Sequence, residues 1–215
     1  QVPAFTIEFR GEPRSALAWG FLPLVAFLQR LGLIADQAKG VQEAASVLER
    51  LVAEMGPDVP AARNPAKALA QRMHGKLAVI YGAGLLTGAA RRWKTQVNEN
   101  AKAWAFFEVL PELHHNALVG LPHPAALRRD IFVVLLRSSL LHPRTLLRYA
   151  ITRDLLAEAG VAHETVEARG ERPLAQMLSC VLCGDYVSYY LALLNGVDPA
   201  PVPVIDKIKK RLAEG

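Results

Sequence analysis

Lys76-Leu77-Ala78-Val79-Ile80-Tyr81, followed at once by Gly82-Ala83-Gly84-Leu85-Leu86-Thr87-Gly88, sets the expected architecture of this chain. The first run is apolar and bounded by glycines, which is typical of a strand buried on both faces of a parallel sheet. The second run is expected to open a helix, because glycine permits a sharp turn and the free N–H groups of a helix N-terminus suit an anion. A dinucleotide-binding fingerprint is the rival interpretation, but its glycine spacing differs and no acidic residue follows at the required distance.

Strand-like and helix-like segments alternate through the rest of this half of the chain. The expected strands are 130–136 and 162–168, and the expected helices are 65–73, 143–159 with Gly160 as C-cap, 174–195 and 204–212. Such alternation predicts an α/β fold in which helices cover an open parallel sheet. Ligands of these sheets bind at the carboxyl ends of the strands, which is where Tyr81 and Gly82 are expected to lie.

The first sixty residues show a different pattern. Residues 4–9 form a β-rich run that would need neighbouring strands, although none precedes it, and this favours a chain that begins partway through a larger protein. Residues 14–33 are apolar at nearly every position and are expected to form a buried helix. Residues 42–55 have the period of an amphipathic helix, and the Pro- and Ala-rich residues 57–65 are expected to be a linker.

Composition narrows the class of protein. The chain has 215 residues, 52% hydrophobic and 21% charged, with a net charge of +5. This charge suits an anionic small molecule or is incidental, and a nucleic-acid partner is not expected because no nucleic-acid motif accompanies it. Its most apolar run, residues 16–28, is shorter than the roughly 20 residues a membrane span requires. No membrane partner and no leader are therefore expected, and the cytoplasm is the expected location. Cys180 and Cys183 lie within a helical pattern without a second ligand pair, which favours buried free thiols over a redox or zinc site.

A polar segment interrupts this apolar chain. It reads Asn98-Glu99-Asn100-Ala101-Lys102 and continues with Pro111-Glu112-Leu113-His114-His115-Asn116. If the helix carrying Glu99 turned back near Pro111, Glu99 and His115 could face one cavity as an acid/base pair. The alternative is a solvated helix face followed by a capping loop.

The residues of this segment and their spacing resemble those of the bifunctional phosphoglucose/phosphomannose isomerases, which are built from sugar-isomerase (SIS) domains. Matching motifs occur in the family's order along the chain: Gly11-x-Pro13-Arg14-x-Ala16-Leu17, residues 79–83, Lys94-x-Gln96-x-Asn98-Glu99-Asn100-Ala101-Lys102, Pro111-Glu112-x-x-His115-Asn116 with Gly120, and residues 190–209. The resemblance implies an SIS-type three-layer αβα sandwich. It also implies that residues 1–60 end a first SIS subdomain and connecting helices, and that residues 61–215 form a second SIS domain.

The resemblance implies aldose–ketose isomerisation of glucose 6-phosphate to fructose 6-phosphate through an enediolate, with mannose 6-phosphate as a candidate second substrate. Glu99 aligns with the base, Arg14 with the arginine that stabilises the intermediate, and Lys209 with a ring-opening lysine. One alternative for Lys209 is a solvated basic face, and another is a register that slips to Lys207 or Lys210. His115 aligns with a ring-opening histidine that comes from the partner subunit, which implies a homodimer, whereas His114 is the structural alternative.

The remaining expectations concern substrate binding, cofactors and the completeness of the site. Gly82, Asn98 and Asn100 are expected to bind or orient substrate, and no cofactor and no metal are expected. The family's upstream phosphate-binding loop is absent here, so these 215 residues alone are expected to be inactive or weak, and Ala117 stands where the family usually has Glu. The competing hypothesis is a non-catalytic module that binds or senses a sugar phosphate.

Overall fold

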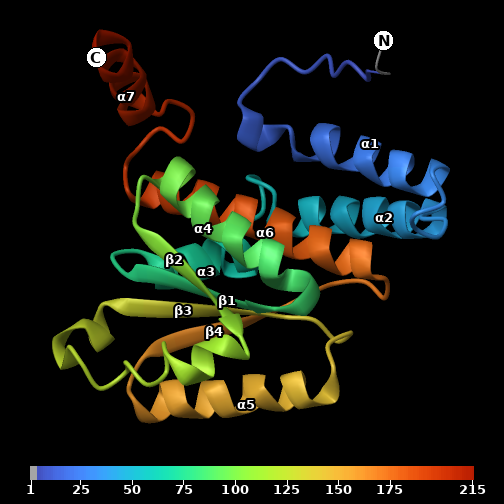
Figure 1. The fold of residues 1–215 in the computed structure, drawn as a ribbon. Helices are drawn as coiled ribbons and strands as arrows, with labels where there is room; N and C mark the ends of the chain where they lie inside the picture. Colours follow the sequence, from blue (N-terminus) through green and yellow to red (C-terminus); the bar gives the residue numbers. More distant parts are fainter. Residues whose placement is uncertain (1–3) are drawn as a thin grey trace.

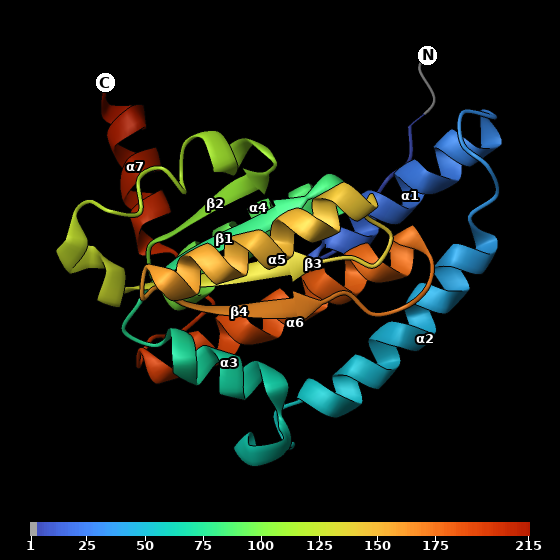
Figure 2. The same ribbon diagram turned by 90° about the horizontal axis from the view of Figure 1, so that it is seen from below.

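The computed structural model describes residues 4–215. Along the chain the elements are α1 (Leu17–Arg30), α2 (Ala38–Met55), α3 (Pro65–Met73), β1 (Leu77–Ala83), α4 (Thr87–Ala101), β2 (Ala105–Leu110), β3 (Ile131–Arg137), α5 (Pro143–Glu158), β4 (Ala162–Glu167), α6 (Pro173–Leu194) and α7 (Pro203–Glu214). The four strands form one parallel sheet in the order β2-β1-β3-β4. Helices α3, α4 and α6 lie on one face of the sheet and α5 covers the other (Figures 1 and 2), so the expected three-layer α/β architecture is confirmed.

Alternation of side chains along β1 divides the core into two clusters. Ala78 and Ile80 point into the larger cluster under α2, α3, α4 and α6, whereas Tyr81 and Ala83 point into the smaller cluster under α5. Burial in the smaller cluster raises the pKa of Tyr81 to about 12, with a further contribution from Glu108 on the neighbouring strand.

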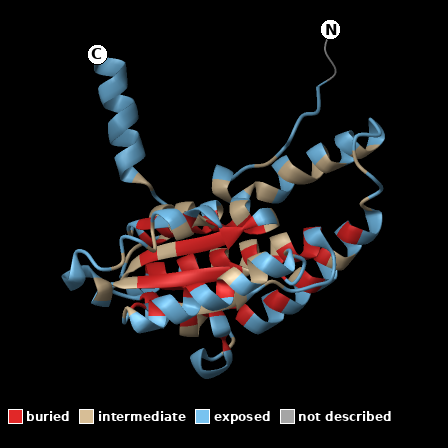
Figure 3. Cartoon of the chain, turned by 60° about the horizontal axis from the view of Figure 1, so that its bottom comes forward, coloured by how far each residue is buried: buried red, intermediate tan, exposed pale blue. Residues whose placement is uncertain are grey.

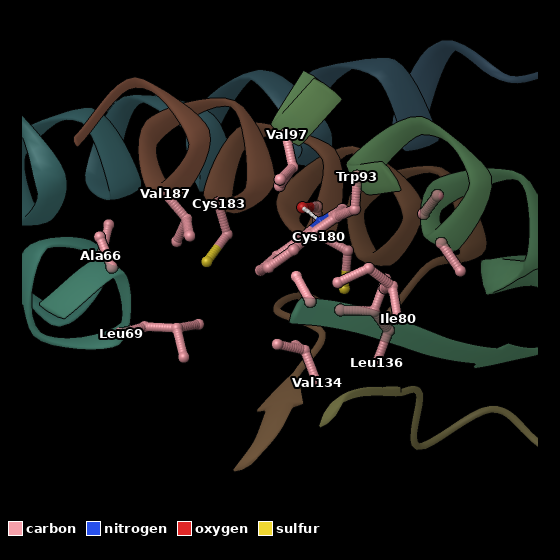
Figure 4. Packing of buried hydrophobic residues seen from close by; sticks show 14 of the residues in the cluster. Ala66, Leu69, Ile80, Trp93, Val97, Val134, Leu136, Cys180, Cys183 and Val187 are labelled. Atoms are coloured by element: carbon pink, nitrogen blue, oxygen red, sulfur yellow. Dashed lines mark hydrogen bonds between the residues drawn. The ribbon is translucent and has the colours of Figure 1, made fainter. Parts of the chain in front are cut away.

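Trp93 of α4 lies in the middle of the larger cluster (Figure 4). Its ring is 1% exposed, and its indole Nε1–H donates to the carbonyl of Cys180 at 2.6 Å. Gly184, one turn further along α6, makes room for the indole, because a Cβ at this position would overlap the ring. Cys180 and Cys183 are buried free thiols in the same helix, as expected from the sequence.

Helix α6 is the central helix of this layer. By length and composition alone it could cross a membrane, but half of its most apolar window is buried inside the fold, where it packs against α2, α3 and α4. Its apolar character is therefore explained by the core that surrounds it.

Two expectations for the N-terminal part are wrong. Residues 4–10 form no strand, because the four-stranded sheet offers them no neighbour to pair with. The apolar helix is shorter than expected, beginning at Leu17 after a 3₁₀ turn at Pro13–Ser15, and it contains no buried residue. Phe21 packs against the core, whereas on the opposite face of α1 the rings of Trp19 and Phe27 meet those of Phe9 and Phe5 in the N-terminal segment and stay 51% and 44% exposed.

Strand β2 is an element that the sequence interpretation missed. It separates the two halves of the polar segment, so the chain does not turn back directly from Glu99 to Pro111. The run Ala105-Phe106-Phe107-Glu108-Val109-Leu110 carries the aromatic and β-branched residues of a strand, and β2 pairs along its length with β1. Gly82 and Ala83 likewise belong to β1 and not to the turn that follows it.

Candidate functional site

The last turn of α4 carries the polar motif, and nearly all of its side chains are engaged by the fold. Asn98 Nδ2 donates to the carbonyl of Ala103 at 2.8 Å and thereby helps to close the end of the helix. Asn100 Nδ2 donates to Ser188 Oγ of α6 at 2.9 Å. Lys102, in the left-handed conformation with φ 54°, ends the helix. The roles of Asn98 and Asn100 visible in the structure are therefore structural.

Glu99 differs from its neighbours. Its side chain is 38% exposed, and the carboxylate faces Arg14, whose Nη1 lies 3.7 Å from Glu99 Oε2. The Arg14 side chain is only 10% exposed and also has Glu12 Oε2 at 3.4 Å. A half-exposed carboxylate beside a buried guanidinium can take up a proton while the guanidinium stabilises a nearby negative charge.

Carbonyl groups of the loop before α7 hold Arg14 in place. Arg14 Nη2 donates to the carbonyl of Pro199 at 3.0 Å and also to that of Ala200. Lys102 Nζ donates to the same Pro199 carbonyl at 3.0 Å and to the carbonyl of Glu99 at 2.6 Å. Two cations thus fasten this loop to the end of α4. Partial burial, followed by the charge of Arg14, lowers the pKa of Lys102, whereas Asp198 and Glu99 act in the opposite direction.

The parallel topology places Gly82 far from Glu99. Helix α4 connects two parallel strands and must run back across the sheet, so that its first turn adjoins the carboxyl end of β1 and its last turn adjoins the amino end of β2. From Thr87 to Glu99 the helix rises about 18 Å. Gly82 is buried, and a Cβ there would meet Ala90 Cβ at 2.8 Å, so the glycine permits close packing of α4 on β1.

His115 and Lys209 also lie apart from Glu99 in this chain. His115 is exposed in a 3₁₀ turn, Glu112–His115, that follows β2, whereas Glu99 precedes that strand, so about 20 Å of strand separates them. The expectation that the two side chains of one chain face one cavity is therefore wrong. Lys209 is exposed on α7, which has no buried residue and projects away from the sheet (Figure 1). Within residues 4–215, neither side chain contacts Glu99 through a hydrogen bond or ion pair.

His114 has a structural role next to the exposed His115. Its Nδ1 lies 3.0 Å from Arg148 Nη1, and because a guanidinium only donates, this ring nitrogen must accept. The other ring nitrogen, Nε2, then carries the proton and donates to Thr152 Oγ1 at 2.8 Å. Burial, followed by the charge of Arg148, lowers the pKa of His114, which keeps the ring neutral.

A cavity of about 280 Å³ adjoins Arg14 between α1, α2 and α6. Its lining is mostly apolar, and its charged side chains are Arg14, Arg92 and Asp185. Sequence reasoning missed Arg92 and Asp185, as well as the role of Lys102. A signal for them existed, because Arg92, Gln96 and Glu99 have the i, i+4, i+7 spacing of one helix face and Asp185 is an isolated acid in an apolar helix. Within the described residues, no group of three His, Cys, Asp or Glu side chains is placed to hold a metal ion.

Comparison with known proteins places this geometry in a family. Residues 62–212 match the bacterial phospho-glucose isomerase C-terminal SIS domain. Two relatives named bifunctional phosphoglucose/phosphomannose isomerase, from Caldicellulosiruptor bescii and Aquifex aeolicus, are 39% and 34% identical over 97% and 94% of this chain. The chain spans 62% and 58% of the length of these two relatives.

Solved structures agree at the level of the fold. A glucose-6-phosphate isomerase like protein from Thermus thermophilus superposes with a TM-score of 0.68 at 25% identity, covering 86% of this chain and 59% of that one. The C-terminal domain of glucosamine-fructose-6-phosphate aminotransferase from Francisella tularensis superposes with a TM-score of 0.52 at 12% identity, covering 74% of this chain and 44% of that one. On the combined match of sequence and fold, the chain belongs to the family of the bacterial phospho-glucose isomerase C-terminal SIS domain.

Proposed function

We propose that the full-length protein carrying these residues is a sugar-phosphate isomerase. It interconverts glucose 6-phosphate with fructose 6-phosphate in the cytoplasm, with mannose 6-phosphate as a candidate second substrate. The observation that carries the proposal is the pair formed by Glu99 and Arg14, since the side chains of Asn98 and Asn100 are already engaged by the fold. The names of the relatives, which are phosphoglucose/phosphomannose isomerases, support the same reaction.

The proposed chemistry follows from the two side chains. In the open-chain aldose, Glu99 removes the proton from C2, the electron pair forms the enediolate, and the protonated carboxyl returns the proton to C1 to give the ketose. Arg14 stabilises the negative oxygen of the enediolate, because its guanidinium is held by carbonyls and one nitrogen faces the reacting region. One carboxylate serves both carbons, since they are adjacent.

The remaining predicted site residues act, in this proposal, together with a second copy of the chain and with a preceding segment. His115 opens the sugar ring from a second copy of the chain, which is supported by its separation from Glu99 within one copy. Lys209 assists ring opening, and Gly82, Asn98 and Asn100 stay predictions as substrate-binding residues. The proposal keeps the expected domain boundary, with residues 1–60 ending a first SIS subdomain and residues 61–215 forming a second SIS domain. A preceding segment holds the phosphate, so that the 215 residues alone turn over substrate weakly or not at all.

A coupled assay on the full-length protein tests the proposal. Fructose 6-phosphate is supplied, and glucose 6-phosphate is followed through a dehydrogenase. Wild type should turn over, and Glu99→Gln should lower kcat by about 10²- to 10⁴-fold, because the amide cannot accept the proton. Glu12→Gln is the matched control, since Glu12 approaches the same Arg14 nitrogen and its loss should leave kcat within about threefold.

The outcomes separate the hypotheses. An equal loss in both variants would assign the effect to the charge balance around Arg14 and would remove Glu99 from the role of base. Binding of fructose 6-phosphate by wild type without any turnover would replace the isomerase by a non-catalytic module.

Mixed dimers test the shared histidine. Glu99→Gln and His115→Ala chains, each inactive alone, are unfolded together and refolded. If His115 acts across the interface, random pairing yields one intact site in half of the dimers and restores about one quarter of wild-type activity. Failure to recover activity, with mixed dimers demonstrated by differential tagging, would contradict a histidine contributed by the partner.

A further inference from the structure

A polar seam runs between α4 and α6 next to the candidate site. Helix α6 is mostly apolar, yet Asp185 lies in it with a side chain 32% exposed. Opposite, α4 presents Arg92 and Gln96 on the face that also carries Glu99. A carboxylate is costly to place in such a seam unless it has charged or hydrogen-bonding partners, so its contacts need an explanation.

Asp185 is held by two side chains of α4. Its Oδ1 accepts a hydrogen bond from Gln96 Nε2 at 2.8 Å and its Oδ2 accepts one from Arg92 Nη2 at 3.0 Å. Gln96 lies three residues before Glu99, which is nearly one turn of helix. Asp185 therefore fixes the position of the last turns of α4 relative to α6.

The same guanidinium nitrogen reaches the segment that carries Arg14. Arg92 Nη2 donates to the main-chain carbonyl of Arg14 at 2.9 Å. The turn around Arg14 is closed by two main-chain hydrogen bonds, from Ser15 N to Glu12 O at 2.8 Å and from Ala16 N to Pro13 O at 3.0 Å. Arg92 thus links this turn, which belongs to the exposed N-terminal segment, to the buried body of the protein.

We propose that Asp185 is a positioning residue which, through Gln96 and Arg92, sets the distance between the Glu99 carboxylate and the Arg14 guanidinium. Gln96 places the helix that carries Glu99, and Arg92 places the backbone that carries Arg14. Asp185 touches neither side chain itself. The inference rests on the proposed function, because it assigns the pair to an isomerase site, but the contact network it describes can be measured without turnover.

Hydrogen exchange tests the network itself. In full-length Asp185→Asn, Arg92 loses its anionic partner and holds the Arg14 carbonyl less well, so the Ser15 and Ala16 amides should exchange about tenfold faster than in wild type. Glu164→Gln is the matched control, because Glu164 is 33% exposed and pairs with Arg72 on another part of the molecule. Unchanged exchange of these two amides in Asp185→Asn would overturn the proposal, whatever the activity.

Kinetics test the consequence for the site. Asp185→Asn should lower kcat by about tenfold to 100-fold while KM changes less than about threefold, because misplacement of Arg14 weakens transition-state stabilisation more than substrate binding. In a double-mutant cycle with Arg14→Lys, the two losses should be markedly less than multiplicative, since both act on the same group. Multiplicative losses, or a kcat within twofold of wild type, would contradict a positioning role.

A second variant guards against misfolding. Arg92→Lys keeps the charge opposite Asp185, but its ammonium lies one bond nearer the backbone than the Nη2 that reaches both Asp185 and the Arg14 carbonyl, so it should show the same exchange and kcat effects at smaller size. Wild-type protein that performs no isomerisation would refute the proposed function alone, because the exchange rates would still decide whether Asp185 holds the turn.

Discussion

The buried body of the molecule, from α2 to α6 with its sheet, contrasts with the two terminal segments, residues 4–30 and α7. Both α1 and α6 are rich in apolar residues, but β1, β3 and α6 are largely buried whereas neither α1 nor the more charged α7 contains a buried residue (Figure 3). For α1 and α6 the difference arises from neighbours and not from composition. An apolar helix needs a covering surface, and its sequence does not state which part of a protein supplies it.

The candidate site lies across this divide. Glu99 belongs to the body, and Arg14 and Lys209 belong to the terminal segments. The contacts that join Arg14 to the body are its ion pair with Glu99 and the hydrogen bond from Arg92 to its main-chain carbonyl, and Arg14 and Lys102 both donate to the Pro199 carbonyl. Perturbations of the apolar core of the body should therefore affect folding, whereas perturbations of the polar contacts between the body and the N-terminal segment should affect the site.

The two tryptophans Trp93 and Trp19 give the sharpest contrast between the regions. Trp93→Ala should lower the free energy of unfolding by about 3–5 kcal/mol, because it empties a large buried site. Trp19→Ala, at a side chain that is 51% exposed, should lower it by less than about 1 kcal/mol. Urea denaturation of the 215-residue chain followed by circular dichroism measures both values. Equal losses would mean that α1 is covered in solution and would break the contrast.

The alkylation rates of the two thiols of α6 provide a chemical measure of how deeply this helix is buried. Burial raises the pKa of Cys183 from 9.0 to about 12, and burial also raises that of Cys180. At pH 8, a rise of three units in the pKa lowers the fraction of thiolate about a thousandfold. A thiolate of higher pKa is more nucleophilic, which raises its reaction rate by about thirtyfold. Alkylation of the native protein should therefore be at least about thirtyfold slower than that of the urea-unfolded chain.

The direction of the pKa shift also predicts how the alkylation rate depends on pH. Because a raised pKa keeps the thiol protonated, the rate of labelling of the native protein should rise about tenfold per pH unit from pH 8 to 10, where an ordinary thiol would level off. Mass spectrometry after timed iodoacetamide quenching gives the rates. Rapid labelling at pH 8 would show that α6 is accessible.

Removal of α7 should have the smallest effect on stability. Truncation after Val202 deletes a helix in which every residue is exposed, and it should change the free energy of unfolding of the 215-residue chain by less than about 1 kcal/mol. The same truncation in the full-length protein should lower turnover, because Lys209 is lost. A stability loss above about 2 kcal/mol would place α7 in the folded body.

The sequence predicted the regular part of the fold well, for a physical reason. β1, β3 and α6 are largely buried runs with clear ends, and α5 begins at Pro143 and ends before Gly160, so local residues decide these patterns. Strand β2 escaped notice because it is an edge strand with Phe106 exposed, next to a polar segment that drew the interpretation away from its aromatic pattern.

The site was less predictable than the fold. The pairing of Arg14 with Glu99 joins residues far apart in the chain, and only the family resemblance indicated that both serve one site. Asp185 and Arg92 carry a periodic signal, but periodicity does not tell which helix faces which. The expected strand at residues 4–9 was wrong because the described sheet offers it no neighbouring strand, and Phe5 and Phe9 of this run instead meet Phe27 and Trp19 on the half-exposed face of α1.

Transfer of solvent deuterium to the sugar tests the role of Glu99 most directly. Full-length protein is incubated with fructose 6-phosphate in D₂O, and deuterium at C2 of glucose 6-phosphate is followed by NMR. The account predicts that wild type incorporates deuterium at this carbon, because the carboxyl exchanges its proton with solvent, and that Glu99→Gln reduces the rate of incorporation by at least about 100-fold. Isomerisation without any label in wild type, or equal labelling by Glu99→Gln, would contradict it.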